Sequence, residues 1–197
     1  EQDDATSIYH KITLLGKQMI LDNLNKINNN TYLRKKQNSD MLLSMFGLHA
    51  SFTLSDKTLE KCVAQGGDKI GFHVHVAEGK GDVKDSLDKY KIPVVKRLDK
   101  LGILGEKTIA VHCIHIDEEE MDILKKSDTM VVHNPESNMG NAVGCADILK
   151  LYDKGILLGL GTDGYTTDMI ESLKVTNILH KHQQGDPSIA WGEPPAM

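Results

Sequence analysis

Imidazole and carboxylate side chains recur at intervals along most of the sequence. Five short apolar segments each end in a side chain that can bind a metal or move a proton: His49, His75, His112, His133 and Asp163. A single histidine at the end of a strand is usually an ordinary polar residue. Five consecutive segments with such an ending are hard to attribute to chance. If the segments are parallel strands, their ends meet on one rim of the sheet, where barrel enzymes build their active sites.

Three of these side chains form a candidate metal site. His75, His112 and Asp163 supply imidazole and carboxylate, the usual zinc ligands, and a catalytic zinc keeps one further position for water. The ion would lower the pKa of that water towards about 7 and make hydroxide available. Asp163 lies between Gly161 and Gly164, and glycines allow the backbone and a ligand to approach closely. An ordinary strand-to-helix turn would have the same sequence.

Two further side chains flank this candidate site. Glu78 follows His75 by three residues, just beyond the predicted strand. A carboxylate beside the water can shuttle protons to a substrate nitrogen if its pKa is suitable, and the alternative is a solvated glutamate in a loop. His73 shares one face of the strand with His75, because side chains alternate with a period of two. The sequence does not decide whether both histidines are ligands.

The remaining polar candidates receive supporting roles or none. His115, three residues after His112, is interpreted as a supporting residue. Residues 134–138 predict a structured turn, with polar side chains available to a substrate or to backbone amides. His180 and His182 predict a solvated helix end, and we assign them no function.

Short apolar strands and amphipathic helices alternate from residue 41 onward. Pro93 suits the first turn of a helix, and Gly66 suits a helix end. Strands are predicted at 46–49, 70–76, 108–112, 130–133 and 156–160. Helices are predicted at 8–28, 55–64, 83–90, 93–101, 117–126, 146–154 and 168–182.

This alternation predicts an α/β protein with a parallel sheet covered by helices. Five strand–helix units fit into the chain, whereas a complete (β/α)8 barrel needs about 250 residues. We therefore expect a partial TIM-type barrel of about five C-terminal β/α units in residues 41–197, or else an open α/β sheet. Residues 1–40 predict a helical segment and a linker. Because the chain begins with Glu1 and ends in a Gly/Pro-rich stretch, we interpret it as a piece of a longer protein.

The composition argues against several classes of function. The net charge is only −5 and no basic patch is present, so we expect no nucleic-acid partner. Apolar runs such as residues 156–160 are too short to span a bilayer, and no stretch has the layout of a signal peptide. Cys62, Cys113 and Cys145 form no CxxC motif, which indicates a reducing, cytoplasmic compartment. We expect all three to be buried as small apolar residues.

Four motifs occur together in a characteristic order. They are HVAE at 75–78, VHCIH at 111–115, VHNPESN at 132–138 and LGTDG at 160–164. In this order they resemble the deaminase and chlorohydrolase branch of the amidohydrolase superfamily, over roughly residues 41–195. Residues 47–56 are most similar to aminohydrolases associated with selenium metabolism. The resemblance implies that the partial barrel is that of a metal-dependent hydrolase.

The resemblance also implies roles in catalysis. His75 and His112 would bind one divalent metal ion, zinc or else iron. Asp163 would lie beside the metal and accept a proton from the attacking water. Glu78 would protonate the substrate ring nitrogen and the leaving group.

Contact with a small heterocyclic substrate is implied for His49, His133 and Asn138. The expected reaction is hydrolysis of a C–N bond, in which a cyclic amidine such as a purine, pyrimidine or pterin loses ammonia. Two alternatives stay open: removal of chloride from a triazine-like ring, and a catalytically inactive barrel fragment with a structural role only. A deaminase of the cytidine type is excluded, because its HxE and PCxxC motifs are absent.

The sequence departs from the family in one important respect. The first strand of the family carries an HxH pair that binds the same metal, and no HxH precedes His49 here. The small β-sandwich of the family is missing as well. These differences predict weak metal binding, or none, by the chain alone. A partial barrel would also expose sheet edges and apolar surface, so we expect a homo-oligomer.

Overall fold

The computed structural model of the chain describes residues 45–66 and 70–197. Within these residues, five strands and seven α-helices follow one another along the chain. The helix predicted at 8–28 and the linker predicted up to residue 40 lie outside the described residues. None of the described helices has the length and hydropathy needed to cross a membrane.

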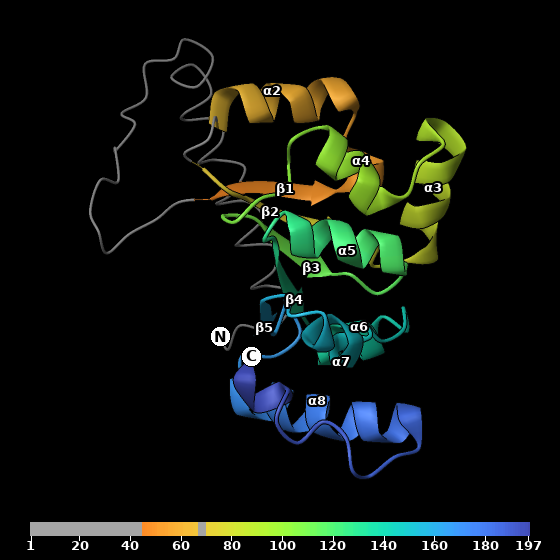
Figure 1. Cartoon of the computed structure of the whole chain (residues 1–197), viewed down its shortest axis with the longest axis vertical. Helices are drawn as coiled ribbons and strands as arrows, with labels where there is room; N and C mark the ends of the chain where they lie inside the picture. Colours follow the sequence, from red (N-terminus) through yellow and green to blue (C-terminus); the bar gives the residue numbers. More distant parts are fainter. Residues whose placement is uncertain (1–44, 67–69) are drawn as a thin grey trace, which may run out of the picture. The chain divides into compact units, whose positions relative to one another are not determined.

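The strands form one parallel sheet, in the order in which they occur in the chain (Figure 1). They are β1 (Phe46–Ala50), β2 (Phe72–Val76), β3 (Ile109–His112), β4 (Met130–His133) and β5 (Leu158–Leu160). In the register, His75 of β2 pairs with Val111 of β3, and His133 of β4 pairs with Leu160 of β5. The ends of neighbouring strands are therefore nearly level at one edge. The predicted parallel sheet is confirmed, and β5 is two residues shorter than expected.

Helices connect the successive strands. They are α2 (Asp56–Gly66), α3 (Lys80–Tyr90), α4 (Val94–Lys100), α5 (Glu118–Lys126), α6 (Pro135–Gly140), α7 (Ile148–Asp153) and α8 (Met169–Gln184), with 3-10 turns η1 (Ser51–Thr53) and η3 (Pro194–Ala196). In Figure 1 the strands descend from β1 to β5, and α8 lies beyond β5. The sequence predicted all of these α-helices except α6, which was expected to be a turn. Pro135 occupies the first turn of α6, where its missing N–H costs no hydrogen bond.

One face of the sheet packs against the helices and forms the core. On β2, Phe72, Val74 and Val76 are buried, whereas His73 and His75 alternate with them and lie on the other face. The core also contains Leu59 of α2, Leu98 of α4, Leu124 of α5 and Leu151 of α7. Each such buried side chain contributes about 1.5–3 kcal/mol. Burial of the apolar positions thus determines which face carries the histidines.

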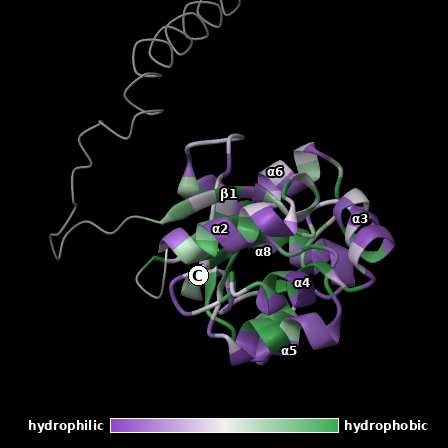
Figure 2. Cartoon of the chain, turned by 90° about the horizontal axis from the view of Figure 1, so that it is seen from above, coloured by the Kyte–Doolittle hydropathy of each residue, from purple (hydrophilic) through white to green (hydrophobic). Residues whose placement is uncertain are grey.

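Helix α5 shows how local sequence and core packing agree. Asp117 accepts a hydrogen bond from the backbone N–H of Glu120, and the Glu120 side chain accepts one from the N–H of Asp117, which completes a capping box. Met121 and Leu124 of this helix are buried. Figure 2 shows hydrophobic residues on one side of α5 and hydrophilic residues on the other. The helix therefore covers the sheet with its apolar side.

A buried arginine ties the segment after β1 to helix α4. Arg97 is 2% exposed, and its Nη1 donates to both the backbone carbonyl and the hydroxyl of Ser51 at 2.7 Å. Its Nη2 donates to the Leu54 carbonyl and to Asp56 Oδ1, also at 2.7 Å. These contacts join residues more than forty positions apart in the chain. They hold in place the loop that follows His49, the substrate contact predicted at the end of β1.

Candidate active site

The ends of β2 and β3 bring two histidines into direct contact. His75 Nδ1 lies 3.0 Å from His112 Nε2, and the two rings stack with their centroids 5.2 Å apart. His112 Nδ1 lies 2.8 Å from the side-chain oxygen of Asn138 in α6. This oxygen can only accept, so His112 carries its proton on Nδ1 and keeps a lone pair on Nε2. The lone pair of His112 is therefore directed towards His75 and the space beside it.

Two carboxylates lie beside the same nitrogen. Glu78 Oε2 is 3.6 Å and Asp163 Oδ2 is 3.9 Å from His112 Nε2. The Ser137 hydroxyl donates to Asp163 Oδ2 at 2.7 Å, and the backbone N–H of Gly164 donates to Oδ1 at the same distance. The hydrogen bond from Ser137, followed by the bond from Gly164, lowers the pKa of Asp163 from its ordinary value. The Asp163 carboxylate is therefore ionised near neutral pH.

The backbone at these strand ends adopts an unusual conformation. His112 and Asp163, with φ angles of 74° and 52°, lie in the left-handed region, as do Ala77 at 46° and Cys113 at 47°. A non-glycine residue held there costs on the order of 1–3 kcal/mol and needs support from its surroundings. The positive φ angles turn the chain sharply at the ends of β2, β3 and β5. The side chains of His112, Glu78 and Asp163 can therefore approach one another above the sheet edge.

Gly161 has a steric role in the loop that carries Asp163. A Cβ atom at this position would lie 2.2 Å from the side-chain oxygen of Asn134 and 2.8 Å from a methyl group of Val132. Any other residue would therefore force the side chains of Asn134 and Val132 to move. The close approach predicted for the glycines is present at Gly161, whereas a Cβ at Gly164 would meet no atom of the described residues within 4 Å.

Asp82 of α3 holds the turn that carries Glu78. Its Oδ2 accepts a hydrogen bond from the backbone N–H of Ala77 at 2.9 Å, and the carboxylate is almost completely buried. Burial raises the pKa of Asp82 from its ordinary value of 3.8, although the bond from Ala77 opposes this shift. Asp85 raises the pKa of Asp82 further, and Arg97 lowers it.

The raised pKa of Asp82 predicts a pH dependence of stability. Above pH 4 the unfolded chain loses the Asp82 proton before the folded chain does, so the folded state binds more protons. The free energy of unfolding should therefore fall as the pH rises through the folded pKa. Asp82→Asn keeps an oxygen for the Ala77 N–H and removes the titration, so urea unfolding from pH 4 to 8 should show a smaller fall. Asp99→Asn, at an exposed position of α4, should keep the wild-type slope, and an equal slope in Asp82→Asn would contradict the assignment.

The histidines and carboxylates at this rim fit a divalent metal ion. His75, Glu78 and His112 each offer a ligand atom, and these atoms all lie within 4.8 Å of one another. Asp163 is not one of these three residues, but its Oδ2 lies 3.9 Å from Nε2 of His112, which is one of them. Imidazole and carboxylate donors suit zinc. The bond between His112 Nδ1 and Asn138 is of the kind that metal-binding histidines make with their second nitrogen.

The other predicted site residues lie around this group. His49 is exposed at the end of β1, with its ring centroid 5.6 Å from that of His75. His73 lies on the same face, 6.4 Å from His75 between ring centroids. His115 Nε2 bonds the backbone carbonyl of Val143 at 2.8 Å, in agreement with a supporting role.

His133 and Asn138, both predicted substrate contacts, are 0% exposed in the structure. Asn138 uses its oxygen to bond His112, and within residues 45–66 and 70–197 neither ring nitrogen of His133 has a hydrogen-bond partner. The His133 ring faces His180, with 5.4 Å between the centroids. Substrate contact by these two residues stays a prediction.

The prediction that His180 is a solvated residue is wrong. His180 is 1% exposed, because α8 buries a stripe made of Ser172, Thr176 and His180, which are spaced four residues apart. The Ser172 hydroxyl donates to Glu136 of α6 at 2.6 Å, so this polar face packs against protein. In the sequence, the four-residue spacing of these polar side chains was the signal that they share one face of the helix. Cys145, whose sulfur lies beside His180, was also missed as a candidate. The prediction that all three cysteines are buried is wrong for Cys62 and Cys145, which are only partly buried, and it is confirmed for Cys113.

Comparison with known proteins places the chain in a family. The sequence profile of the Amidohydrolase family matches residues 12–191 of the 197. The chain belongs to the Amidohydrolase family. This amidohydrolase chain carries the HxxE and GTDG motifs at the rim described above, and members of the family are metal-dependent.

Individual relatives are deaminases of adenosine-like compounds by name. The 5'-deoxyadenosine deaminase of Methanopyrus kandleri is 37% identical over 162 residues, which cover 79% of the amidohydrolase chain and 37% of the relative. A 5-methylthioadenosine/S-adenosylhomocysteine deaminase of Syntrophomonas wolfei is 38% identical over 150 residues, covering 73% and 35%. The chain thus spans little more than a third of the length of these relatives.

A solved structure confirms the fold. An adenosine deaminase from Xanthomonas campestris, crystallised with bound zinc, superimposes with a TM-score of 0.72 at 27% sequence identity. The match covers 77% of the amidohydrolase chain and 36% of the other chain. The five parallel β/α units are therefore part of a TIM-type amidohydrolase barrel, as predicted.

Proposed function

We propose that the chain carries part of the active site of a zinc-dependent deaminase that acts on an aminopurine or a related cyclic amidine. The observation that carries this proposal is the convergence of two imidazoles and two carboxylates, from the ends of β2, β3 and β5, on one rim. The names of the relatives favour an adenosine-like substrate. Iron is the alternative metal, because the donor set suits either ion.

His75 and His112, with Asp163 and Glu78 beside them, would hold the metal. When bound, the ion supplies a water molecule of lowered pKa. Asn138 fixes the tautomer of His112, so that Nε2 presents its lone pair to the site. Ser137 and Gly164 hold the Asp163 carboxylate in one orientation.

Proton transfers by the two carboxylates complete the reaction. Asp163, which is ionised, accepts a proton from the attacking water as its oxygen adds to the amino-bearing ring carbon. Glu78 donates a proton to the adjacent ring nitrogen. Asp163 then passes its proton to the amino group, the C–N bond breaks and ammonia leaves. The hydroxyl proton on the ring carbon returns to Glu78, so the carbon becomes a carbonyl. His49, exposed beside His75, lies where a heterocycle bound at this rim would contact it.

Ammonia release tests the proposed function. The protein expressed from its complete gene should release ammonia from at least one member of a panel of purine nucleosides, free purines and pterins, with about one metal ion per site by elemental analysis. Chloride release from a chlorotriazine would identify the alternative hydrolase instead. Absence of both metal and turnover in that protein would contradict the proposal and favour a structural remnant. The 197-residue chain, tested in parallel, would report how much of the metal site it holds alone.

Asn138 provides a test of how His112 is positioned. Asn138→Ala should weaken metal binding by about 10–100-fold, the usual effect of removing a hydrogen bond behind a histidine ligand. Asn138→Asp should restore most of the affinity, because its carboxylate also accepts from His112 Nδ1. Competition with a chromophoric chelator measures the affinity, and thermal unfolding checks that both variants fold. Equal affinity in Asn138→Ala and wild type would show that His112 needs no such support.

A further inference from the structure

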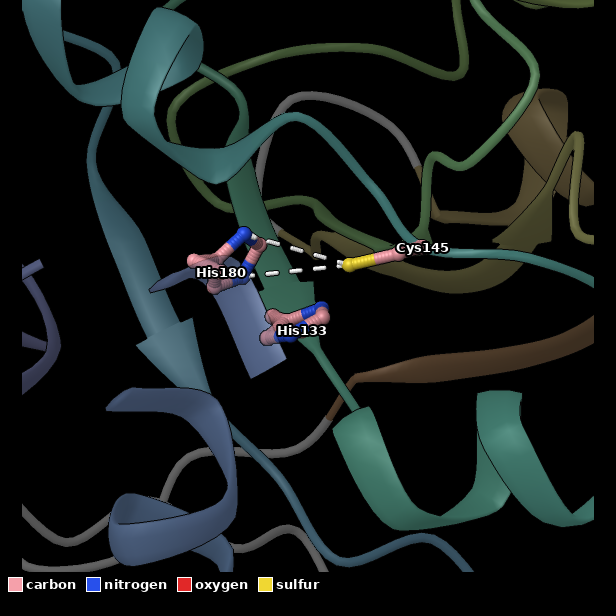
Figure 3. Close-up of side chains that lie close together, drawn as sticks. All are labelled: His133, Cys145 and His180. Atoms are coloured by element: carbon pink, nitrogen blue, oxygen red, sulfur yellow. Dashed lines mark hydrogen bonds between the residues drawn. The ribbon is translucent and has the colours of Figure 1, made fainter. Parts of the chain in front are cut away.

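A second group of metal-binding side chains lies behind the first. His133 ends β4, Cys145 lies between α6 and α7, and His180 lies in α8 (Figure 3). Each offers one ligand atom, and these atoms all lie within 4.8 Å of one another. Cys145 Sγ is 3.9 Å from both ring nitrogens of His180. None of the three belongs to the catalytic group at the rim.

His133 is the least satisfied polar side chain of this cluster. Its ring is completely buried, and neither nitrogen has a hydrogen-bond partner among the described residues. A buried polar atom without a partner costs about 1–3 kcal/mol. Two such atoms in one ring, facing another buried histidine and a thiol, indicate that a further species completes the cluster.

The electrostatic surroundings leave lone pairs on both imidazoles. Burial, reinforced by His180, lowers the pKa of His133 to about 3. Burial also lowers the pKa of His180. Both rings are therefore neutral at physiological pH. The nearby Asp147 carboxylate acts on Cys145 and His180 and adds negative charge, which favours a cation.

We propose that His133, Cys145 and His180 bind a second transition-metal ion of the zinc class, separate from the centre at His75 and His112. Zinc bonds of about 2.0–2.3 Å in tetrahedral geometry put nitrogen and sulfur ligands about 3.6 Å apart. The observed 3.9 Å between Cys145 Sγ and His180 is close to this value. Because Sγ is equally far from both ring nitrogens, the His180 ring must rotate to direct one of them at a shared ion. Three protein ligands leave the fourth position to water or to another small donor.

The surface beside Cys145 gives such an ion a route to the site. A groove of about 450 Å³ is lined by Asn138, Met139, Cys145 and Leu179, among others. Cys145 is only partly buried, whereas the two histidines behind it are closed off. Binding converts the thiol to a thiolate and releases its proton to solvent. The simplest competing occupant is a buried water molecule, which would bond the imidazoles and leave the thiol protonated.

Cobalt substitution separates the two sites, because only the second contains sulfur. The protein from its complete gene, titrated with Co²⁺, should develop a near-ultraviolet charge-transfer band from thiolate to cobalt. Cys145→Ser should remove this band. It should also lower the affinity of the second site for Zn²⁺ by more than about 100-fold, because removal of a hydrogen bond behind a metal ligand already lowers the metal affinity by about 10–100-fold. Cys62→Ser, which changes a partly buried cysteine of α2 outside the cluster, should keep the band.

The outcome does not depend on deaminase activity. A band that persists in His75→Ala and disappears in Cys145→Ser supports the second site, even if no substrate is turned over. Absence of the band in the wild-type protein, or its survival in Cys145→Ser, overturns the proposal and leaves a buried water as the occupant. His180→Gln provides an independent variant if Cys145→Ser fails to fold, and it should also abolish the band.

Discussion

Glu78→Gln is expected to lower kcat for deamination by about 10²–10⁴-fold, the usual contribution of a positioned general acid or base. Glu78 Oε2 lies 3.6 Å from His112 Nε2, and its other oxygen is 3.4 Å from the side-chain nitrogen of Asn141. Glutamine preserves the size and the contact with Asn141. It has no proton to give to the ring nitrogen, so the barrier to addition of water rises.

Steady-state kinetics on the protein from its complete gene, with the substrate found in the ammonia panel, measures this effect. KM should change much less than kcat, because the lost interaction develops in the transition state. Glu119→Gln makes the same chemical change at an exposed position of α5 and should leave kcat unchanged. A Glu78→Gln enzyme with wild-type kcat and a full complement of metal would remove Glu78 from the mechanism.

His75→Ala is expected to weaken metal binding at the rim by more than about 100-fold and to abolish turnover with it. Loss of a hydrogen bond behind a histidine ligand already costs about 10–100-fold, and removal of the ligand itself should cost more. His75 Nδ1 contacts His112 Nε2 at 3.0 Å, so the substitution also removes the nearest neighbour of that lone pair.

The chain offers a closely matched control in the same strand. His73 lies two residues before His75 on the same face of β2, 6.4 Å away between ring centroids. His73→Ala removes the same side chain from the same face of the strand, at a more exposed position, and it should leave the metal affinity within a few-fold of wild type. Metal content after dialysis and competition with a chelator distinguish the two variants. Equal losses in both would show that both histidines of this strand hold the ion.

The order and type of the secondary-structure elements could be predicted, because they depend on local sequence. Apolar alternation at Phe72, Val74 and Val76 places these side chains on one face, and His73 and His75 consequently lie on the other. Parallel strands must bring their ends to one rim whatever the details of packing. For this reason the proximity of His75, His112 and the two carboxylates followed from the motifs.

Other features depend on neighbours that lie far away along the chain. Helix α8 buries Ser172, Thr176 and His180 and leaves Ile170 74% exposed, the reverse of what its apolar residues predict. The reason is that Glu136 of α6 supplies a polar partner for Ser172. The four-residue spacing of Ser172, Thr176 and His180 places them on one face of α8, but the sequence does not show which element packs against that face, so the buried His180 was predicted to be solvated.

The sequence by itself determined the alternating strands and helices, the rim on which they end, and the family-specific motifs at that rim. Only the tertiary structure decided that Asn138 bonds His112 across 26 positions and that Cys145 meets His180 across 35. It also decided that the carboxylates of Glu78 and Asp163 are turned towards His112, where left-handed residues such as Ala77 and Asp163 bend the chain. The physical reason is that hydrophobic periodicity reports which side chains share a face, whereas the partner of each polar atom is set by packing between elements that are distant in the chain.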